Sequence, residues 1–169
     1  MSDFEWTKIF ENEIEKYTGD FWQLEFDDTI IPGAPNRGWK QYIRNTFGRF
    51  KCSKCKRGWP SNRVTVVFHF RLNKKHGGSV KVRLYRQKCK ICRHAPMVKP
   101  TVDTENIDIL MENLVKNIRW KCYHEDIEKN TRDHVGQDVE SPHEPDHCEG
   151  CISGICKLKD AAEFYRSRR

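Results

Sequence analysis

The sequence contains no aspartate or glutamate between residues 29 and 102, although acidic residues are frequent on both sides of this stretch. The first 28 residues hold nine acids, and the segment after residue 102 holds 15. Residues 36–100 carry 19 lysines and arginines, so the net charge of +7 is concentrated in the middle of the chain. A basic block of this kind predicts an anionic partner, such as RNA, DNA, an acidic protein segment or anionic lipid.

Long apolar runs are absent as well. No stretch approaches the roughly 20 apolar residues of a membrane-spanning helix, and the first ten residues lack the basic and apolar regions of a secretory signal peptide. We therefore expect a cytoplasmic chain whose cysteines stay reduced. The hydrophobic content of 37% predicts a thin core, which usually needs a metal, disulfides or a partner for stability.

Catalytic motifs are missing too. The sequence has no H-E-x-x-H, no G-x-S-x-G, no P-loop and no zinc deaminase signature. A catalytic zinc usually keeps one coordination position open, whereas cysteines here can close every shell. These absences predict a binding protein rather than an enzyme.

Cysteine, in contrast, is abundant, and six of the eight cysteines form three C-x-x-C pairs. The pairs are Cys52 with Cys55, Cys89 with Cys92, and Cys148 with Cys151. Two intervening residues place two thiolates on one tetrahedral zinc ion. The first two pairs enclose a predicted β-hairpin, so we expect a zinc ribbon in which each pair forms a knuckle, a tight turn whose backbone amides point at the sulfurs.

The third pair requires further ligands. Cys156 follows closely, and the preferred set for a second zinc is His143, Cys148, Cys151 and Cys156. His147 and Cys122 are alternative fourth ligands, although Cys122 is better explained as a small buried residue or a free thiol. Spacing also permits the third pair to share an ion with another pair, so the expected number of zinc ions is one or two.

Hydrophobic periodicity predicts an α+β fold: a zinc-ribbon-like antiparallel sheet with two flanking helices, stabilised by zinc. The helices are expected at residues 2–17 and 104–120, and the strands at residues 21–26, 64–72 and 80–87. Residues 1–156 form the predicted zinc-binding domain, within which 124–146 is expected to be a mobile acidic loop. Residues 157–169 form a short basic tail.

The basic block supplies a candidate surface for an anionic partner. Its residues are Lys51, Lys54, Lys56, Arg57, Lys81, Arg83, Lys88, Lys90 and Arg93. The negative charge of a four-thiolate zinc site would offset only a few of these cations. Aromatic residues interleave with them, and they either stack on bases or belong to the core. They are Trp39, Tyr42, Phe47, Trp59 and Tyr85.

The order of these motifs resembles the receptor-transporting proteins, whose zinc-finger domain has three C-x-x-C pairs. The similarity covers roughly residues 4 to 156, and it lies in FEWTKIF, GWKQY at 38–42, FGRFKCSKCKRGW at 47–59, VRLYRQKCKIC at 82–92, LMENLV at 110–115 and HCEGCISGIC at 147–156. The resemblance implies a chaperone that helps chemosensory (olfactory or taste) and other G-protein-coupled receptors reach the cell surface. It also implies zinc ligation by the seven cysteines of the three pairs and Cys156, with His143 as the best match to the family's histidine.

Two further expectations come from the resemblance. Some family members are linked to interferon and act against viruses through RNA binding, which makes an RNA-binding module the alternative function. Family members typically end in a membrane helix, whereas this sequence stops at Arg169. The basic residues Arg166, Arg168 and Arg169 are consistent with the flank of such an anchor. We therefore expect a location at the cytoplasmic face of secretory-pathway or plasma membranes, reached through the client or an anchor outside this chain.

Overall fold

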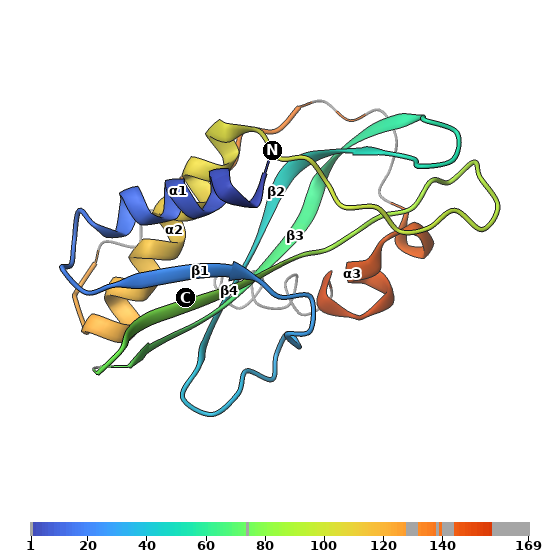
Figure 1. The fold of residues 1–169 in the computed structure, drawn as a ribbon. Helices are drawn as coiled ribbons and strands as arrows, with labels where there is room; N and C mark the ends of the chain where they lie inside the picture. Colours follow the sequence, from blue (N-terminus) through green and yellow to red (C-terminus); the bar gives the residue numbers. More distant parts are fainter. Residues whose placement is uncertain (1, 74, 128–131, 138, 140–143, 157–169) are drawn as a thin grey trace, which may run out of the picture.

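A four-stranded sheet with two helices on one face forms the body of the molecule in the computed structural model (Figure 1). The structure describes residues 2–73, 75–127, 132–137, 139 and 144–156. The helices are α1 (Asp3–Ile14) and α2 (Thr104–Tyr123), followed by the short η1 (Pro145–His147) and α3 (Glu149–Ile152). The strands are β1 (Trp22–Phe26), β2 (Lys40–Lys51), β3 (Gly58–Asn73) and β4 (Gly77–Leu84), arranged in the order β1-β4-β3-β2. The predicted α+β class with two flanking helices is confirmed.

Helix α1 begins where the sequence provides a cap. The hydroxyl of Ser2 accepts a hydrogen bond from the backbone amide of Glu5 at 3.3 Å, which satisfies one of the free donors at the helix start. Trp6, Phe10 and Ile14 recur at helical spacing and are all buried. This face of α1 packs against α2 and β1, so the helix is fixed by its apolar stripe.

The strands β3 and β4 alternate as expected. Val66, Phe68 and Phe70 of β3 are fully buried in the main core beneath the helices. Val80 and Val82 of β4 join the same core. Side chains at every second strand position face the same side of a sheet, so these alternate residues line the inner face of β3 and β4, and the two predicted strands are confirmed.

Two features of the sheet depart from the prediction. Strand β2 was not expected at all, because a bulge between Thr46 and Gly48 interrupts its alternation. Strand β1 pairs with β4 in parallel, so the sheet is mixed rather than purely antiparallel. The pairs β2–β3 and β3–β4 are antiparallel, as predicted. The parallel neighbour arises because β1 comes from outside the hairpins and docks along the edge of β4.

The sheet face opposite the helices carries a second, smaller core. Val67 and Tyr85 pack there against Ile155, Cys148 and Cys156 of the third cysteine block. The sequence left open whether Tyr85 stacks on bases or belongs to the core, and this block leaves it only 2% exposed. In Figure 1, α3 lies beside the sheet, away from α1 and α2.

The described residues of segment 124–146 run back along α2. Asn106 donates to the carbonyl of Val135 and accepts from its amide, at 3.0 and 2.8 Å. Asn113 donates to the carbonyl of Arg132 at 2.8 Å. Both asparagines are buried on α2, and the hydrogen bonds to the returning backbone satisfy both ends of the Asn106 amide and the donor of the Asn113 amide.

Candidate metal centre

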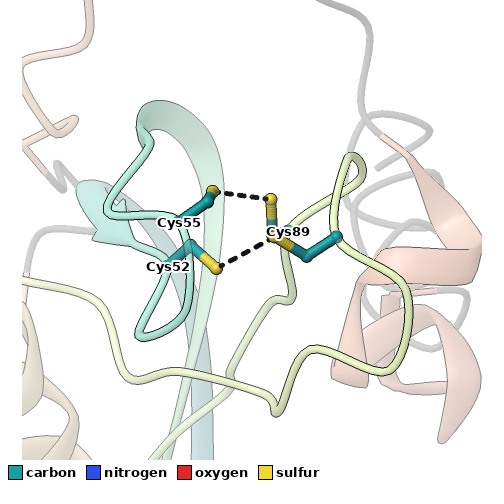
Figure 2. A group of neighbouring side chains, drawn as sticks. Cys52, Cys55 and Cys89 are labelled. Carbon is teal, nitrogen blue, oxygen red and sulfur yellow. Dashed lines mark hydrogen bonds between the residues drawn. The ribbon is translucent and has the colours of Figure 1, made fainter.

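Four cysteines from two separate loops meet at one end of the sheet. Cys52 and Cys55 lie in the turn between β2 and β3, just after the last pair of that ladder, and Figure 2 shows both beside Cys89. Cys89 and Cys92 lie in the loop after β4. Gln87 and Val98 close that loop through two backbone hydrogen bonds of 3.2 and 2.7 Å.

The spacing of these sulfurs fits a tetrahedral zinc ion. The Sγ atoms of Cys52 and Cys92 are 3.9 Å apart, and those of Cys55 and Cys89 are 3.8 Å apart. All four lie within 4.8 Å of one another. Zinc–sulfur bonds near 2.3 Å in a tetrahedron place the sulfurs about 3.8 Å apart. We call Cys52, Cys55, Cys89 and Cys92 the four-cysteine cluster.

Backbone amides prepare two of these sulfurs for the thiolate state. A hydrogen bond from the amide of Cys92, assisted by the Arg57 side chain, lowers the pKa of Cys89 to about 6. The amide of Cys55 likewise lowers the pKa of Cys52. Hydrogen bonding with Cys55 and burial raise the pKa of Cys92 to about 12. A negative charge on this fourth thiol is unfavourable beside the other thiols unless a cation is bound. A divalent cation would favour ionisation of all four thiols.

A second group of sulfurs, Cys148, Cys151 and Cys156, lies against the other face of the sheet, and we call it the three-cysteine cluster. The Sγ atoms of Cys148 and Cys156 are 4.0 Å apart, and the amide of Cys151 donates to the sulfur of Cys148 at 3.4 Å. A Cβ atom on Gly150 would lie 2.9 Å from the sulfur of Cys156. Glycine at this position therefore allows the turn to close around three converging sulfurs.

The two groups are separate in the described residues. Each set of sulfurs has its own centre, so the geometry favours two ions over one ion shared between pairs. Of the candidate fourth ligands, His147 is half-buried with its Nδ1 lacking a hydrogen-bond partner, yet it does not join the three sulfurs. Cys122 packs at the edge of the main core, where burial raises the pKa of its thiol. His143 lies outside the described residues.

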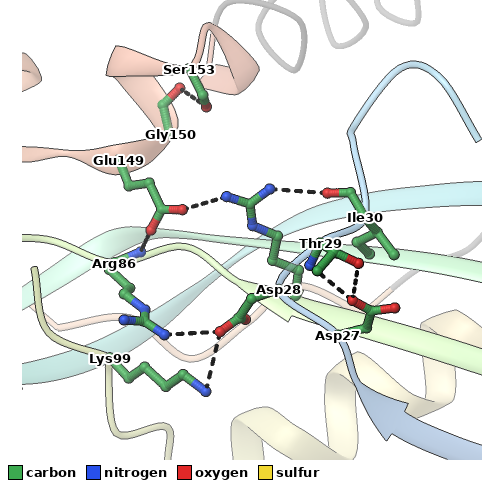
Figure 3. A network of polar contacts seen from close by, with 10 residues as sticks. Asp27, Asp28, Thr29, Ile30, Arg86, Lys99, Glu149, Gly150 and Ser153 are labelled. Carbon is green, nitrogen blue, oxygen red and sulfur yellow. Dashed lines mark hydrogen bonds and ion pairs between the residues drawn. The ribbon is translucent and has the colours of Figure 1, made fainter.

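A polar network holds the three-cysteine block onto the sheet (Figure 3). Glu149 accepts from the Arg83 guanidinium at 2.6 Å and from the Arg86 amide at 3.0 Å. Arg83 also donates to the carbonyl of Ile30 at 3.0 Å. Asp28 binds Arg86 at 2.9 Å. The network joins β4, the loop after β1 and α3, three segments that are distant in sequence.

The candidate basic surface divides into two parts. Lys81 pairs with Asp27 at 3.3 Å, and Arg83 pairs with Glu149, so these two cations have internal partners. The remaining cations surround the four-cysteine cluster, and no carboxylate of the described chain forms an ion pair with them. They are Lys51, Lys54, Lys56, Arg57, Lys88, Lys90 and Arg93.

The aromatic residues that interleave with the cations of the basic block pack against other side chains instead of pointing into solvent. Tyr42, Phe47 and Tyr85 are at most 4% exposed. Trp59 stacks on Phe50 with ring centroids 5.4 Å apart, and the Arg57 guanidinium covers it at 4.8 Å. Trp39 lies under the ammonium group of Lys81. The sequence left open whether these aromatic side chains stack on bases or belong to the core. The structure shows that they are packed.

Glu149→Gln is expected to loosen the three-cysteine block from the sheet. The substitution weakens a charge-assisted hydrogen bond at a partly buried site, which we expect to cost about 1–3 kcal/mol of unfolding free energy. Asp133→Asn is the matched control, because the Asp133 side chain is 94% exposed and its pairing with Arg44 should contribute little. Urea denaturation of both variants measures the difference. Equal stabilities would show that the Glu149 network does not hold the block.

Comparison with known proteins agrees with this geometry. Residues 45–154 match the family model of a zinc-binding domain, a zinc ribbon with three C-x-x-C pairs. The chain is 36% identical to receptor-transporting protein 2 of Mus musculus over 168 residues, which cover 97% of this chain and 75% of that protein. The chain belongs to the receptor-transporting protein family. It is a zinc-binding protein, and its two cysteine clusters are the sites that can hold the metal.

Other members of the receptor-transporting protein family are longer than this chain. The identity to receptor-transporting protein 3 of Mus musculus is 34% over 94% of this chain but only 34% of the relative. With receptor-transporting protein 1 of Homo sapiens the identity is also 34%, over 95% of this chain and 62% of the relative. No solved structure matches the chain. None of the helices in the described residues combines the length and apolar character needed to cross a membrane.

Proposed function

We propose that this chain is an accessory protein that binds G-protein-coupled receptors, chemosensory receptors among them, and promotes their delivery to the cell surface. The observation that carries the proposal is similarity along nearly the whole chain to several proteins named receptor-transporting proteins. The client-binding site is proposed to face the cytoplasm, where the thiols stay reduced and available for zinc.

The cysteine geometry supports binding rather than catalysis. We infer that Cys52, Cys55, Cys89 and Cys92 complete a closed shell around one zinc ion, and that Cys148, Cys151 and Cys156 supply three ligands to a second. A closed four-thiolate shell leaves no position for substrate or water. Its contribution is to fix two loops that have few apolar contacts of their own, since among the described residues Ala95 and the partly buried Trp59 are the hydrophobic side chains that pack with these cysteines.

Co-expression with receptors tests the proposal. A panel of epitope-tagged olfactory and taste receptors is expressed with the chain, and surface receptor is measured by flow cytometry on intact cells. We expect surface levels of at least some receptors to rise with no change in total receptor. The Cys52→Ser/Cys89→Ser variant, compared at matched protein level, should lose the effect. Unchanged surface levels across the whole panel would contradict the proposal.

RNA binding is the second candidate, favoured by the unpaired cations around the four-cysteine cluster. Phosphate contacts make affinity fall steeply with salt, by about one power of the salt concentration for each phosphate neutralised. Fluorescence anisotropy with a generic single-stranded RNA over a salt series distinguishes this role. Absence of binding at low salt would remove RNA from consideration without affecting the receptor proposal.

A further inference from the structure

The tips of the two zinc knuckles expose an aliphatic side chain among cations. Ile91, between Cys89 and Cys92, is 68% exposed. Exposed lysines and an arginine lie nearby, and each is within one or two positions of a cysteine of the four-cysteine cluster along the chain. We call this set the knuckle surface: Ile91 with Lys51, Lys54, Lys56, Lys90 and Arg93.

These residues share one end of the molecule. The four sulfurs lie within 4.8 Å of one another, so residues next to them along the chain surround a common centre. Lys54 precedes Cys55, and Lys90 and Ile91 separate Cys89 from Cys92. Figure 1 shows the β2–β3 turn and the loop after β4 projecting beyond the sheet at the same end. The two tips can therefore meet a single flat surface together.

Ion pairs and core packing within the described chain do not account for the exposed part of the knuckle surface. Lys56 donates to the carbonyl of Ser53 at 3.0 Å, but Lys54, Lys90 and Arg93 form no ion pair within the described chain. An isoleucine that is 68% exposed makes little contact with the core. The combination of solvent-facing cations and a protruding aliphatic residue instead resembles the contact made by proteins that lie on a membrane interface.

The details favour a lipid surface over RNA. Single-stranded nucleic acid is usually held by exposed aromatic side chains on which bases stack. Around the knuckles, Trp59 stacks on Phe50 and is covered by Arg57, so in the part of the chain that the structure describes this tryptophan offers no free face beside the cations. Ile91 offers no stacking surface, whereas its side chain can insert among acyl chains while lysines bind lipid phosphates.

We propose that the knuckle surface binds the surface of a membrane containing anionic phospholipids, with Ile91 inserted at the interface and Lys54, Lys90 and Arg93 at the headgroups. This contact would hold the zinc end of the domain against the bilayer. It goes beyond the proposed function, since it requires no receptor and is testable with lipid alone.

Sedimentation with vesicles tests the contact using zinc-loaded full chain. The vesicles are phosphatidylcholine alone or phosphatidylcholine with roughly 30% phosphatidylserine, and partitioning to the anionic vesicles is expected to weaken with salt. Lys54→Ala/Lys90→Ala should lower partitioning to the anionic vesicles about thirtyfold. Ile91→Ser should lower it about fivefold, because the aliphatic contact is lost while the charge is kept. Native mass spectrometry confirms that each variant keeps its zinc.

Matched controls separate local contact from net charge. Lys8 and Lys75 are exposed lysines in α1 and in the β3–β4 turn, away from the knuckles, so Lys8→Ala/Lys75→Ala removes the same charge elsewhere. Ile152→Ser removes an isoleucine that is 62% exposed on the three-cysteine block. Both controls should partition like the wild type. Equal losses in control and knuckle variants, equal binding to neutral and anionic vesicles, or binding to single-stranded RNA without vesicle binding would each overturn the proposal.

Discussion

Replacing Cys89 with serine is expected to remove one zinc ion of two and to destabilise the whole domain. The substitution takes one of four converging sulfurs from the four-cysteine cluster. Apparent binding energies of structural zinc sites reach about 10–16 kcal/mol, whereas a whole domain is stable by only about 5–15 kcal/mol. We therefore expect the thermal midpoint to fall by at least about 10 °C, at roughly 2–4 °C per kcal/mol for a chain of this size.

Native mass spectrometry measures the zinc content directly. Wild type should carry two ions, Cys89→Ser should keep the ion at the three-cysteine cluster, and Cys148→Ser should keep the ion at the four-cysteine cluster. Cys122→Ser is the control: Cys122 lies outside both clusters, so the variant should keep both ions. One ion in wild type that disappears in both ligand variants would mean that the pairs share a site. No zinc in wild type would overturn the ligand assignment.

Gly78→Ala is expected to have the second largest effect, because this glycine lies where two strands meet most closely. Gly78 pairs with Trp22 across the parallel β1–β4 ladder, and its amide donates to the Phe21 carbonyl at 2.8 Å. A Cβ atom there would lie 2.1 Å from the Trp22 ring. The indole is 2% exposed and its Nε1 donates to the Tyr123 hydroxyl at 3.0 Å, so the ring cannot move away freely.

The expected cost of Gly78→Ala is about 2–3 kcal/mol of unfolding free energy, as for overpacked cores. Urea denaturation followed by circular dichroism measures it. Gly19→Ala is the control, because a Cβ atom on Gly19 meets nothing within 4 Å. Shrinking the ring with Trp22→Leu should relieve the clash, so the double variant should lose less stability than the sum of the two single variants. Strict additivity, or no loss in Gly78→Ala, would contradict a close packing of β1 on β4.

Sequence patterns predicted those parts of the fold in which the determining residues are neighbours along the chain. The helix at the N-terminus was predicted from hydrophobic periodicity, because the apolar stripe of a helix is defined within a few residues. The two-residue spacing of each cysteine pair is a local feature that predicts a knuckle. The sequence therefore predicted these cysteines as metal ligands, although it left open how they group into clusters. The alternation of β3 and β4 likewise needed no distant information.

Strand β2 and the parallel docking of β1 required the tertiary structure. The bulge near Gly48 breaks the period that would have revealed β2. Position 48 requires glycine because a Cβ atom there would lie 2.9 Å from the Val64 side chain and 3.2 Å from the Thr101 carbonyl oxygen. Gly77 and Gly78 begin β4 directly after the β3–β4 turn and make room for Phe21 and Trp22. This role depends on a contact between segments more than 50 residues apart, which no local pattern reveals.

The sequence by itself determined that the chain carries the paired cysteines of a zinc-binding domain and that a basic block surrounds the first two pairs, because spacing and composition are local properties. Only the tertiary structure decided which cations are engaged: Lys81 and Arg83 meet Asp27 and Glu149, which come from distant acidic segments. It likewise decided that Trp59 is packed while Ile91 protrudes. Pairing and exposure depend on which segments fold against each other, and the order of residues along one segment does not contain that information.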